Sequence, residues 1–176
     1  MPSPFSRIVA DLFSLTSSDF SFDDVKRRVL QLGWRITEEV PRDFVLRVLI
    51  DDAVSELVAS LDRKEEFGPT LYLPLFYTED TYDGISEKKM RERPAFDVAF
   101  AMANEAATER LRPPTAAGRY GYPGQSTDYS YSAWRGERGV LFLVQDDFDI
   151  QFGSEITAWL APADRRDPIP RLPLHR

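Results

Sequence analysis

The sequence predicts an α+β domain with an antiparallel sheet, and three observations support this fold class. Strand-like runs follow one another with few helices between them, which favours antiparallel neighbours. Apolar residues recur at helical spacing in residues 4–15, 22–33 and 94–111. The composition, 43% apolar and 29% charged over 176 residues, is that of one soluble globular unit. We therefore expect residues 1–161 to form a single domain and the Pro-rich residues 162–176 to form an extended tail.

The ends of the expected helices carry recognisable signals. In the second helix Ser21 is the expected N-cap and Gly33 is the residue that ends the helix. Phe20 can pack onto Val25 as a hydrophobic staple. The third helix is expected to open at Pro94, because proline suits the first helical turn. Its apolar stripe, expected to pack across the sheet, consists of Phe96, Phe100, Ala103, Ala107 and Leu111.

The strands are predicted from alternating or continuous apolar runs, and there are about six of them. The expected strands are 34–40, 44–50, 53–61, 129–134, 140–145 and 155–161. Residues 53–61 also fit a helix, and the strand is preferred because the "DD" before them suits a hairpin turn. Between 67 and 93 we expect an extended segment and a loop, with Pro74 arguing against a central strand. Residues 112–128 are expected to be an irregular connection. After the leading helix this gives the order α-β-β-β-α-β-β-β, a sheet backed by roughly two or three helices.

The charge and the missing motifs limit the possible functions. Lys and Arg total 22 against 29 Asp and Glu, and the resulting net charge of −7 repels nucleic-acid phosphates but suits a basic protein partner. With no cysteine, disulfides and thiolate metal sites are excluded, and the one histidine, His175, lies in the Pro-rich tail. The sequence contains no phosphate-binding glycine loop, no hydrolase motif and no apolar run long enough to span a membrane, and we expect no signal peptide. We expect a cytoplasmic protein without catalytic activity, cofactor or metal.

The stretch "QDDFDIQFG" places three carboxylates, Asp146, Asp147 and Asp149, at the end of a buried strand, and three interpretations are open. Asp146 and Asp147 can form the turn of a hairpin, with Asp149 in solvent. Asp147 and Asp149 can share a face and hold a divalent cation or act as acid and base, although their spacing does not match a calcium loop. The third interpretation is a docking surface for a basic protein, in which charge steers the encounter.

Aromatic residues favour the docking surface, because Tyr and Trp supply contact area and several tyrosines precede the acidic stretch. The residues expected to bind a partner are Asp146, Asp147, Asp149, Tyr120, Tyr122 and Trp134. Tyr129 and Tyr131 are expected instead to pack on the sheet. We expect this chain to be a monomer or a weak homodimer.

Two resemblances add to this interpretation. A helix ending in "LQLGW", a strand meander and the late "YSAWRGERGVLFLVQDDFDIQFGSEITAWLAP" resemble small bacterial immunity proteins of polymorphic toxin systems. That resemblance implies a cytoplasmic, non-catalytic, acidic protein that neutralises a partner toxin by occluding its active site. The element order also resembles type III secretion chaperones, which implies a dimer that binds a segment of an effector. The long Tyr/Gly/Pro connection and the Pro-rich end of the chain depart from the chaperone pattern.

Overall fold

The computed structural model describes residues 4–40, 45–49, 56–60, 70–77, 85–120, 129–149 and 153–163, with the side chains of 7–39, 46, 48, 93–120, 129–145 and 156–163. The helices are α1 (Pro4–Ser14), the short 3-10 helix η1 (Leu15–Ser17), α2 (Phe22–Gln31) and α3 (Ile85–Arg110). The strands are β1 (Arg35–Val40), β2 (Val45–Leu49), β3 (Glu56–Ser60), β4 (Thr70–Tyr77), β5 (Ala116–Tyr120), β6 (Tyr129–Arg135), β7 (Gly139–Asp149) and β8 (Gly153–Pro162).

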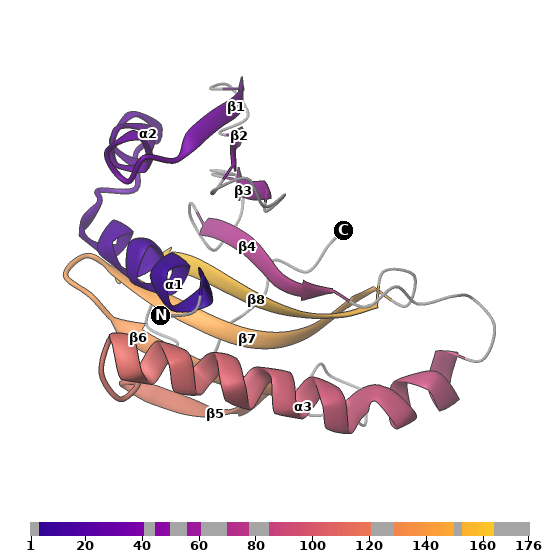
Figure 1. The fold of residues 1–176 in the computed structure, drawn as a ribbon. Helices are drawn as coiled ribbons and strands as arrows, with labels where there is room; N and C mark the ends of the chain where they lie inside the picture. Colours follow the sequence, from indigo (N-terminus) through magenta and orange to yellow (C-terminus); the bar gives the residue numbers. More distant parts are fainter. Residues whose placement is uncertain are drawn as a thin grey trace.

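The described strands form one antiparallel sheet in the order β1-β2-β3-β4-β8-β7-β6-β5 (Figure 1). Strands β1 to β4 form one meander that starts at one edge of the sheet. The chain then passes through α3 and forms a second meander, β5 to β8, which starts at the opposite edge and ends at the centre. The two meanders meet where β4 pairs with β8. The α+β class and the antiparallel sheet are therefore confirmed. The sheet has eight strands rather than about six, because β4 and β5 lie in segments that were not expected to be strands.

The prediction that Pro74 keeps its segment out of the sheet centre is wrong. Strand β4 lies between β3 and β8, and Pro74 is in register with Thr157. The register between β4 and β8 shifts between Pro74 and Phe76. A bulge interrupts the hydrogen-bond ladder locally, so the missing N–H of Pro74 lies next to an interruption of the pairing.

The third helix begins earlier than its apolar pattern indicates. Helix α3 starts at Ile85, so Pro94 lies inside the helix and does not open it, and the loop expected before Pro94 is helical from Ile85 onward. The reason is composition: residues 86–93, "SEKKMRER", are rich in Glu, Lys, Met and Arg, which favour helix without apolar periodicity. The expected apolar stripe is confirmed, since Phe96, Phe100 and Ala107 are buried.

The irregular connection expected over 112–128 contains the edge strand β5. Small residues such as Ala116 and Gly118 have little strand preference of their own, so the neighbouring strand decides their structure. A Cβ added to Gly118 would lie 3.1 Å from Cε1 of Tyr131, its register partner on β6. The tyrosine ring thus covers the glycine, an arrangement that stabilises glycine in a sheet.

Several local predictions are confirmed. Residues 53–61 contain strand β3, which pairs with β2 and β4. The Ser21 hydroxyl accepts a hydrogen bond from the N–H of Asp24 at 3.3 Å and caps α2. Gly33 follows the helix with a φ of +79°, the left-handed conformation that suits glycine at this position.

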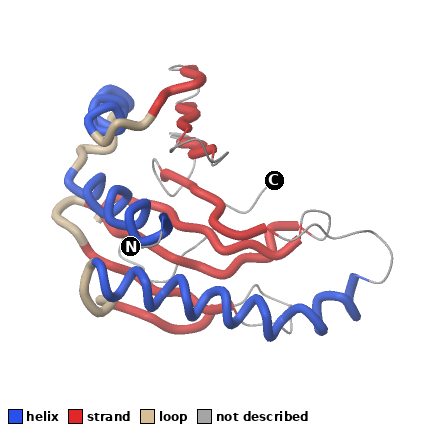
Figure 2. Tube along the Cα trace, in the orientation of Figure 1, coloured by secondary structure: helices blue, strands red, loops and turns tan. Residues whose placement is uncertain are grey.

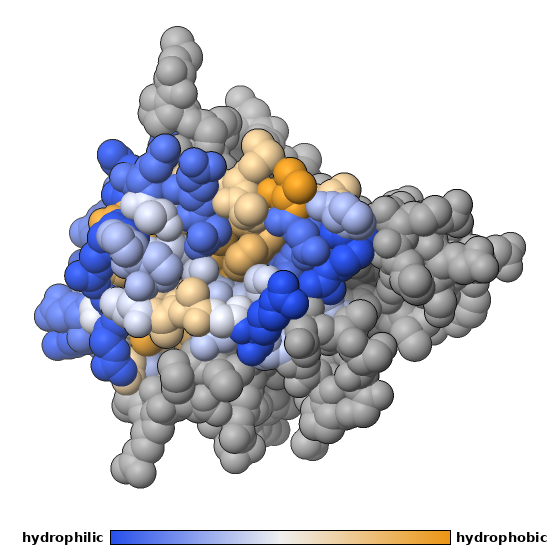
Figure 3. All heavy atoms as spheres, turned by 90° about the horizontal axis from the view of Figure 1, so that it is seen from below, coloured by the Kyte–Doolittle hydropathy of each residue, from blue (hydrophilic) through white to orange (hydrophobic). Residues whose placement is uncertain are grey.

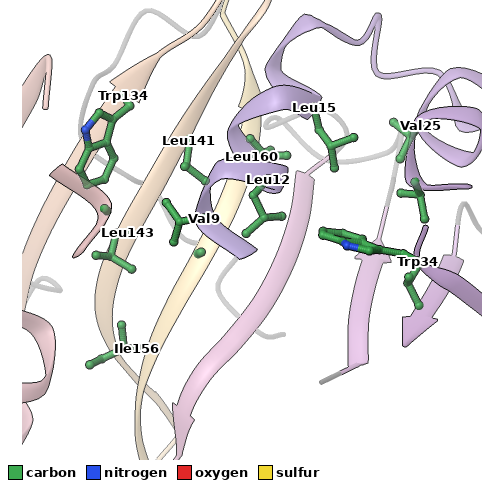
Figure 4. Close-up of a cluster of buried hydrophobic side chains, with 14 of the residues drawn as sticks. Val9, Leu12, Leu15, Val25, Trp34, Trp134, Leu141, Leu143, Ile156 and Leu160 are labelled. Carbon is green, nitrogen blue, oxygen red and sulfur yellow. The ribbon is translucent and has the colours of Figure 1, made fainter. Parts of the chain in front are cut away.

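The main hydrophobic core joins α1 and η1, which come first in the chain, to β7 and β8, which come last. Helices α1 and α3 pack against one face of the sheet (Figures 1 and 2). Figure 4 shows Val9, Leu12 and Leu15 next to residues from β7 and β8. A second cluster, with Phe142 and Trp159 at 5.2 Å between ring centroids, occupies the alternate positions of the same strands. Strands buried on both faces explain the nearly continuous apolar run at the start of β7.

The described residues end near the expected boundary between domain and tail, and the division itself stays a prediction. Strand β8 ends at Pro162, one residue beyond the expected boundary, and the Pro-rich residues 164–176 and His175 lie outside the described part. No helix in the described ranges combines the length and the apolar character needed to cross a bilayer.

Candidate functional site

The acidic stretch is part of strand β7, which corrects the turn interpretation. β7 continues to Asp149, so the turn that joins it to β8 falls after the three aspartates. Asp146 is in register with Glu155 and Asp147 with Ser154. The register shifts between Asp147 and Asp149, as at a β-bulge. We call residues 145–149 with 153–155 the acidic end of the β7–β8 hairpin. It is held in sheet pairing, although the side chains of its carboxylates lie outside the described set.

Gln145 starts the acidic end and is fully buried. Its Nε2 donates to Asp97 Oδ1 at 2.9 Å and to the carbonyl of Phe96 at 3.3 Å, both on α3. Its Oε1 accepts from the N–H of Ser130 on β6 at 2.9 Å. The Tyr120 hydroxyl donates to the Gln145 carbonyl from the edge strand β5. The side-chain amide of Gln145 therefore ties β6 and α3 to β7, and its main-chain carbonyl ties β5 to the same point, immediately before the three aspartates.

Arg93 extends this network along α3. Its Nε donates to Asp97 Oδ1 at 2.8 Å, the same oxygen that accepts from Gln145. Its guanidinium carbon lies 5.5 Å from the ring centroid of Tyr129 and 6.0 Å from that of Phe96. Such distances are within the range of cation–π attraction. The arginine therefore locks Asp97 in the position that receives Gln145.

Three tyrosines form a cluster beside this network. Tyr120 lies 5.9 Å from Tyr129 and 6.3 Å from Tyr131, measured between ring centroids. Tyr129 and Tyr131 are buried, which confirms that they pack on the sheet. Tyr120 is half-buried and is the one of the three with substantial solvent contact. Tyr122 lies outside the described residues.

Trp134 does not lie on the surface expected for partner binding. Its side chain is fully buried, and its indole N–H donates to the carbonyl of Arg112 at 2.8 Å. Trp134 was expected on that surface because Tyr and Trp supply contact area, but both faces of β6 are covered. Trp134 is a core residue whose register partner is Leu141.

Among the described side chains, no group of three His, Cys, Asp or Glu residues gathers in a way that could hold a metal ion. The described set does not include the side chains of Asp146, Asp147 and Asp149. The expectation that they bind no metal therefore stays a prediction.

The described carboxylates with shifted pKa values lie at the start of α2, where they serve a structural role. The Ser21 hydroxyl and N–H both donate to Asp19 and lower the pKa of that carboxyl. For Asp24, burial alone would raise the pKa, but hydrogen bonds from the Asp19 N–H, Arg28 and Arg27 outweigh it and lower the pKa. Asp24 thus ties the segment before α2 to the first turn of the helix, because its carboxylate accepts from the N–H of Asp19 while its own N–H donates to the Ser21 hydroxyl.

Sequence reasoning missed Gln145, Arg93 and Asp97, although two signals were present. Gln145 ends the apolar run "VLFLVQ", and a polar residue in a buried strand needs hydrogen-bond partners. Arg93 and Asp97 have the i, i+4 spacing of a helical ion pair. This spacing brings two side chains together only on a helix, and Arg93 was expected in a loop.

Comparison of this chain with protein-family models, with curated proteins and with solved structures finds no match to any of them.

Proposed function

We propose that this chain is a non-catalytic, protein-binding module that binds a basic partner through the acidic end of the β7–β8 hairpin, with Tyr120 beside it. The class of protein that best fits this description is an immunity-type inhibitor that neutralises a toxin, and its expected location is the cytoplasm. The partner surface on this chain comprises Asp146, Asp147, Asp149, Tyr120 and Tyr122. Trp134 has no part in it.

The observation that carries the proposal is the register of the hairpin. Asp146 stands directly opposite Glu155, and Asp147 and Asp149 continue the same strand. Like charges at opposed positions of antiparallel strands are unfavourable. A cationic partner relieves this repulsion between carboxylates. The relief contributes to the free energy of binding.

The buried network supports the proposal because it fixes the backbone that carries the acids. Gln145 connects β7 to α3 and β6, and Tyr120 connects β5 to the same residue. Binding to a rigid surface loses less conformational entropy than binding to a loose turn. The acidic end therefore has both the charge and the support that a docking surface needs.

The test is a pull-down of the partner from the source cell, followed by binding kinetics of Asp147→Lys combined with Asp149→Lys. We expect affinity at low salt to fall by about tenfold or more, with a slower association rate and a faster dissociation rate. The effect on association should weaken as salt rises, because salt screens long-range attraction. The matched control is Asp23→Lys with Glu137→Lys, the same change in charge at two exposed positions on α2 and between β6 and β7.

Two outcomes count against the proposal. If the hairpin variant binds the partner within a factor of two of the original chain at low salt, the acids are only solvated. If the control variant weakens binding equally, net charge alone acts and no particular surface is involved. Mg²⁺ or Ca²⁺ bound by Asp146, Asp147 or Asp149 in soaked crystals would instead support a metal-dependent activity.

A second candidate function rests on the edge strand β5. Ala117, Gly118 and Arg119 are exposed, and β5 pairs only with β6 among the described strands. An open edge can accept an extended segment as an added strand, which is how a chaperone-like protein could hold an effector. Hydrogen exchange separates the two candidates, since strand addition protects the amides of 116–120 while docking on the acidic end protects those of 146–155.

A further inference from the structure

The outward face of helix α3 carries apolar residues without cover. Phe96, Phe100 and Ala107 face the core, and on the opposite side Val98 is 59% and Met102 66% exposed. Ala95 and Ala101 are also exposed beside them. α3 lies along the lower edge of the fold in Figure 1, and the view from below in Figure 3 shows apolar surface bordered by hydrophilic residues.

The exposed residues of α3 follow a heptad pattern. Ala95, Val98, Met102, Glu105 and Glu109 are spaced alternately three and four residues apart, and all five are exposed. This is the a/d spacing by which two helices pair along a seam. The pattern continues toward the start of α3 with the basic positions Arg91 and Lys88. Along the helix the seam therefore runs from basic, through apolar, to acidic positions.

This order makes the seam complementary to itself in an antiparallel arrangement. With a twofold axis near Phe100, each Val98 stands opposite the Met102 of a second copy. The same register sets Glu109 against Arg91 and Glu105 against the small Ala95. A parallel arrangement would set Glu109 against Glu109 and Glu105 against Glu105, which is repulsive.

We propose that α3 is a homodimer interface, in which a second copy of this chain packs its own α3 antiparallel on the seam from Arg91 to Glu109. Charge complementarity favours the second copy as the occupant, because the antiparallel register sets Glu109 of each copy opposite the basic position Arg91 of the other. The seam is about 27 Å long at 1.5 Å per residue. We expect a weak dimer, with a dissociation constant of about 10 to 100 μM.

The first experiment is sedimentation velocity of the full chain at concentrations from about 5 to 500 μM. We expect the original chain to shift from monomer to dimer over this range. Val98→Glu with Met102→Glu should remain monomeric throughout. The matched control is Leu30→Glu on α2, an apolar-to-acidic change at a residue that is 52% exposed, and this variant should dimerise like the original chain.

The second experiment tests the direction of pairing by exchanging charges. Arg91→Glu alone and Glu109→Arg alone should each weaken the dimer about tenfold, since each places like charges together at two symmetric points. The double variant Arg91→Glu with Glu109→Arg should restore the dissociation constant to within about threefold of the original. A parallel dimer would not show this rescue.

Monomeric behaviour of the original chain at every concentration would overturn the proposal. It is overturned equally if the Val98/Met102 variant still dimerises, if Leu30→Glu dissociates the dimer, or if the charge exchange fails to rescue. Circular dichroism on each variant verifies that it is folded. None of these outcomes bears on partner binding by the acidic end, so the two proposals fail or hold independently.

Discussion

The two ends of strand β7 are held by different forces. At its start, which we call the anchored end, Gly139 approaches the ring of Phe20, and the N–H of Arg138 donates to the carbonyl of Thr16 at 2.9 Å. At the acidic end, the side chain of Gln145 makes hydrogen bonds to α3 and β6. Close packing and backbone bonds fix the first end, whereas a network of polar side chains fixes the second.

This difference indicates which part of the strand can serve binding. Packing between Gly139 and Phe20 leaves no space for an added atom at that position, so this contact serves stability. A polar network positions the backbone from behind and leaves the residues that follow it, here the three aspartates, for other contacts. Changes at the anchored end should therefore affect stability alone, and changes at the acidic end should affect stability and binding together.

The largest effect is expected for Trp134→Ala on β6, whose register partner Leu141 lies near the anchored end of β7. This substitution removes a fully buried indole and its hydrogen bond to Arg112, and it should lower the free energy of unfolding by about 4 kcal/mol. Urea denaturation measures the loss, and Trp134→Phe is the milder control. The folded fraction should keep its affinity for the partner. A loss of affinity with little loss of stability would return Trp134 to the binding surface.

The next effect is expected for Gln145→Leu at the acidic end. Leucine cannot accept from the N–H of Ser130 or donate to Asp97, so a buried donor loses its partner and stability should fall by about 2 to 3 kcal/mol. Tyr120→Phe, which removes one hydroxyl from a half-buried ring, should cost about 1 kcal/mol. In contrast to Trp134→Ala, the Gln145 variant should also bind the partner more weakly. Unchanged affinity would show that the network does not support the binding surface.

A smaller effect is expected for Gly139→Ala. The added Cβ would lie 2.6 Å from Cζ of Phe20 and 3.1 Å from the carbonyl oxygen of Ala161, so neighbouring atoms must move, at a cost of about 2 kcal/mol. Phe20→Leu in the same chain should recover part of the loss, which a double-mutant cycle detects. The control is Gly118→Ala on the edge strand, where the contact is with one ring at 3.1 Å. If both alanines cost the same, the anchored end is not especially tight.

Those parts of the fold that local periodicity determines were predictable from the sequence. The buried stripe of α3, with Phe96 and Phe100, follows directly from helical spacing, as do the cap at Ser21 and the stop at Gly33. Residues 86–93 form helix through composition, which the spacing of apolar residues does not reveal. Strands β4 and β5 depend on their neighbours: a register shift accompanies Pro74, and Tyr131 covers Gly118.

The candidate site was predictable in position and not in detail. The sequence places Asp146, Asp147 and Asp149 at the end of a buried strand, and the structure keeps them together in β7. Strand β7 continues through the three aspartates because it pairs with β8. Turn propensity is a local property of the sequence and does not predict this pairing. The burial of Trp134 depends likewise on tertiary structure, since alternation along β6 does not reveal that both faces are covered.

An effect as small as that of Tyr120→Phe, and one that depends on pH, concerns Asp24 at the start of α2. Arg28 forms an ion pair with Asp24 and also donates to the Ser17 hydroxyl at 2.6 Å. The carbonyl of the preceding residue, Thr16, accepts from the N–H of Arg138 at the anchored end. Asp24→Asn removes the ion pair and should cost about 1 kcal/mol at neutral pH.

The pKa of Asp24 is lowered in the folded chain, so its ionised form contributes stability above the unfolded value of 3.8. That contribution is lost as the pH falls below 3.8 and through the folded pKa. Urea denaturation of the original chain and of Asp24→Asn should therefore give a constant difference between about pH 5 and 7, which shrinks in more acidic solution. A difference that stays constant to pH values well below 3.8 would show that Asp24 acts as a neutral cap. The anchored end would then depend on packing alone, without the charged cap of α2 behind it.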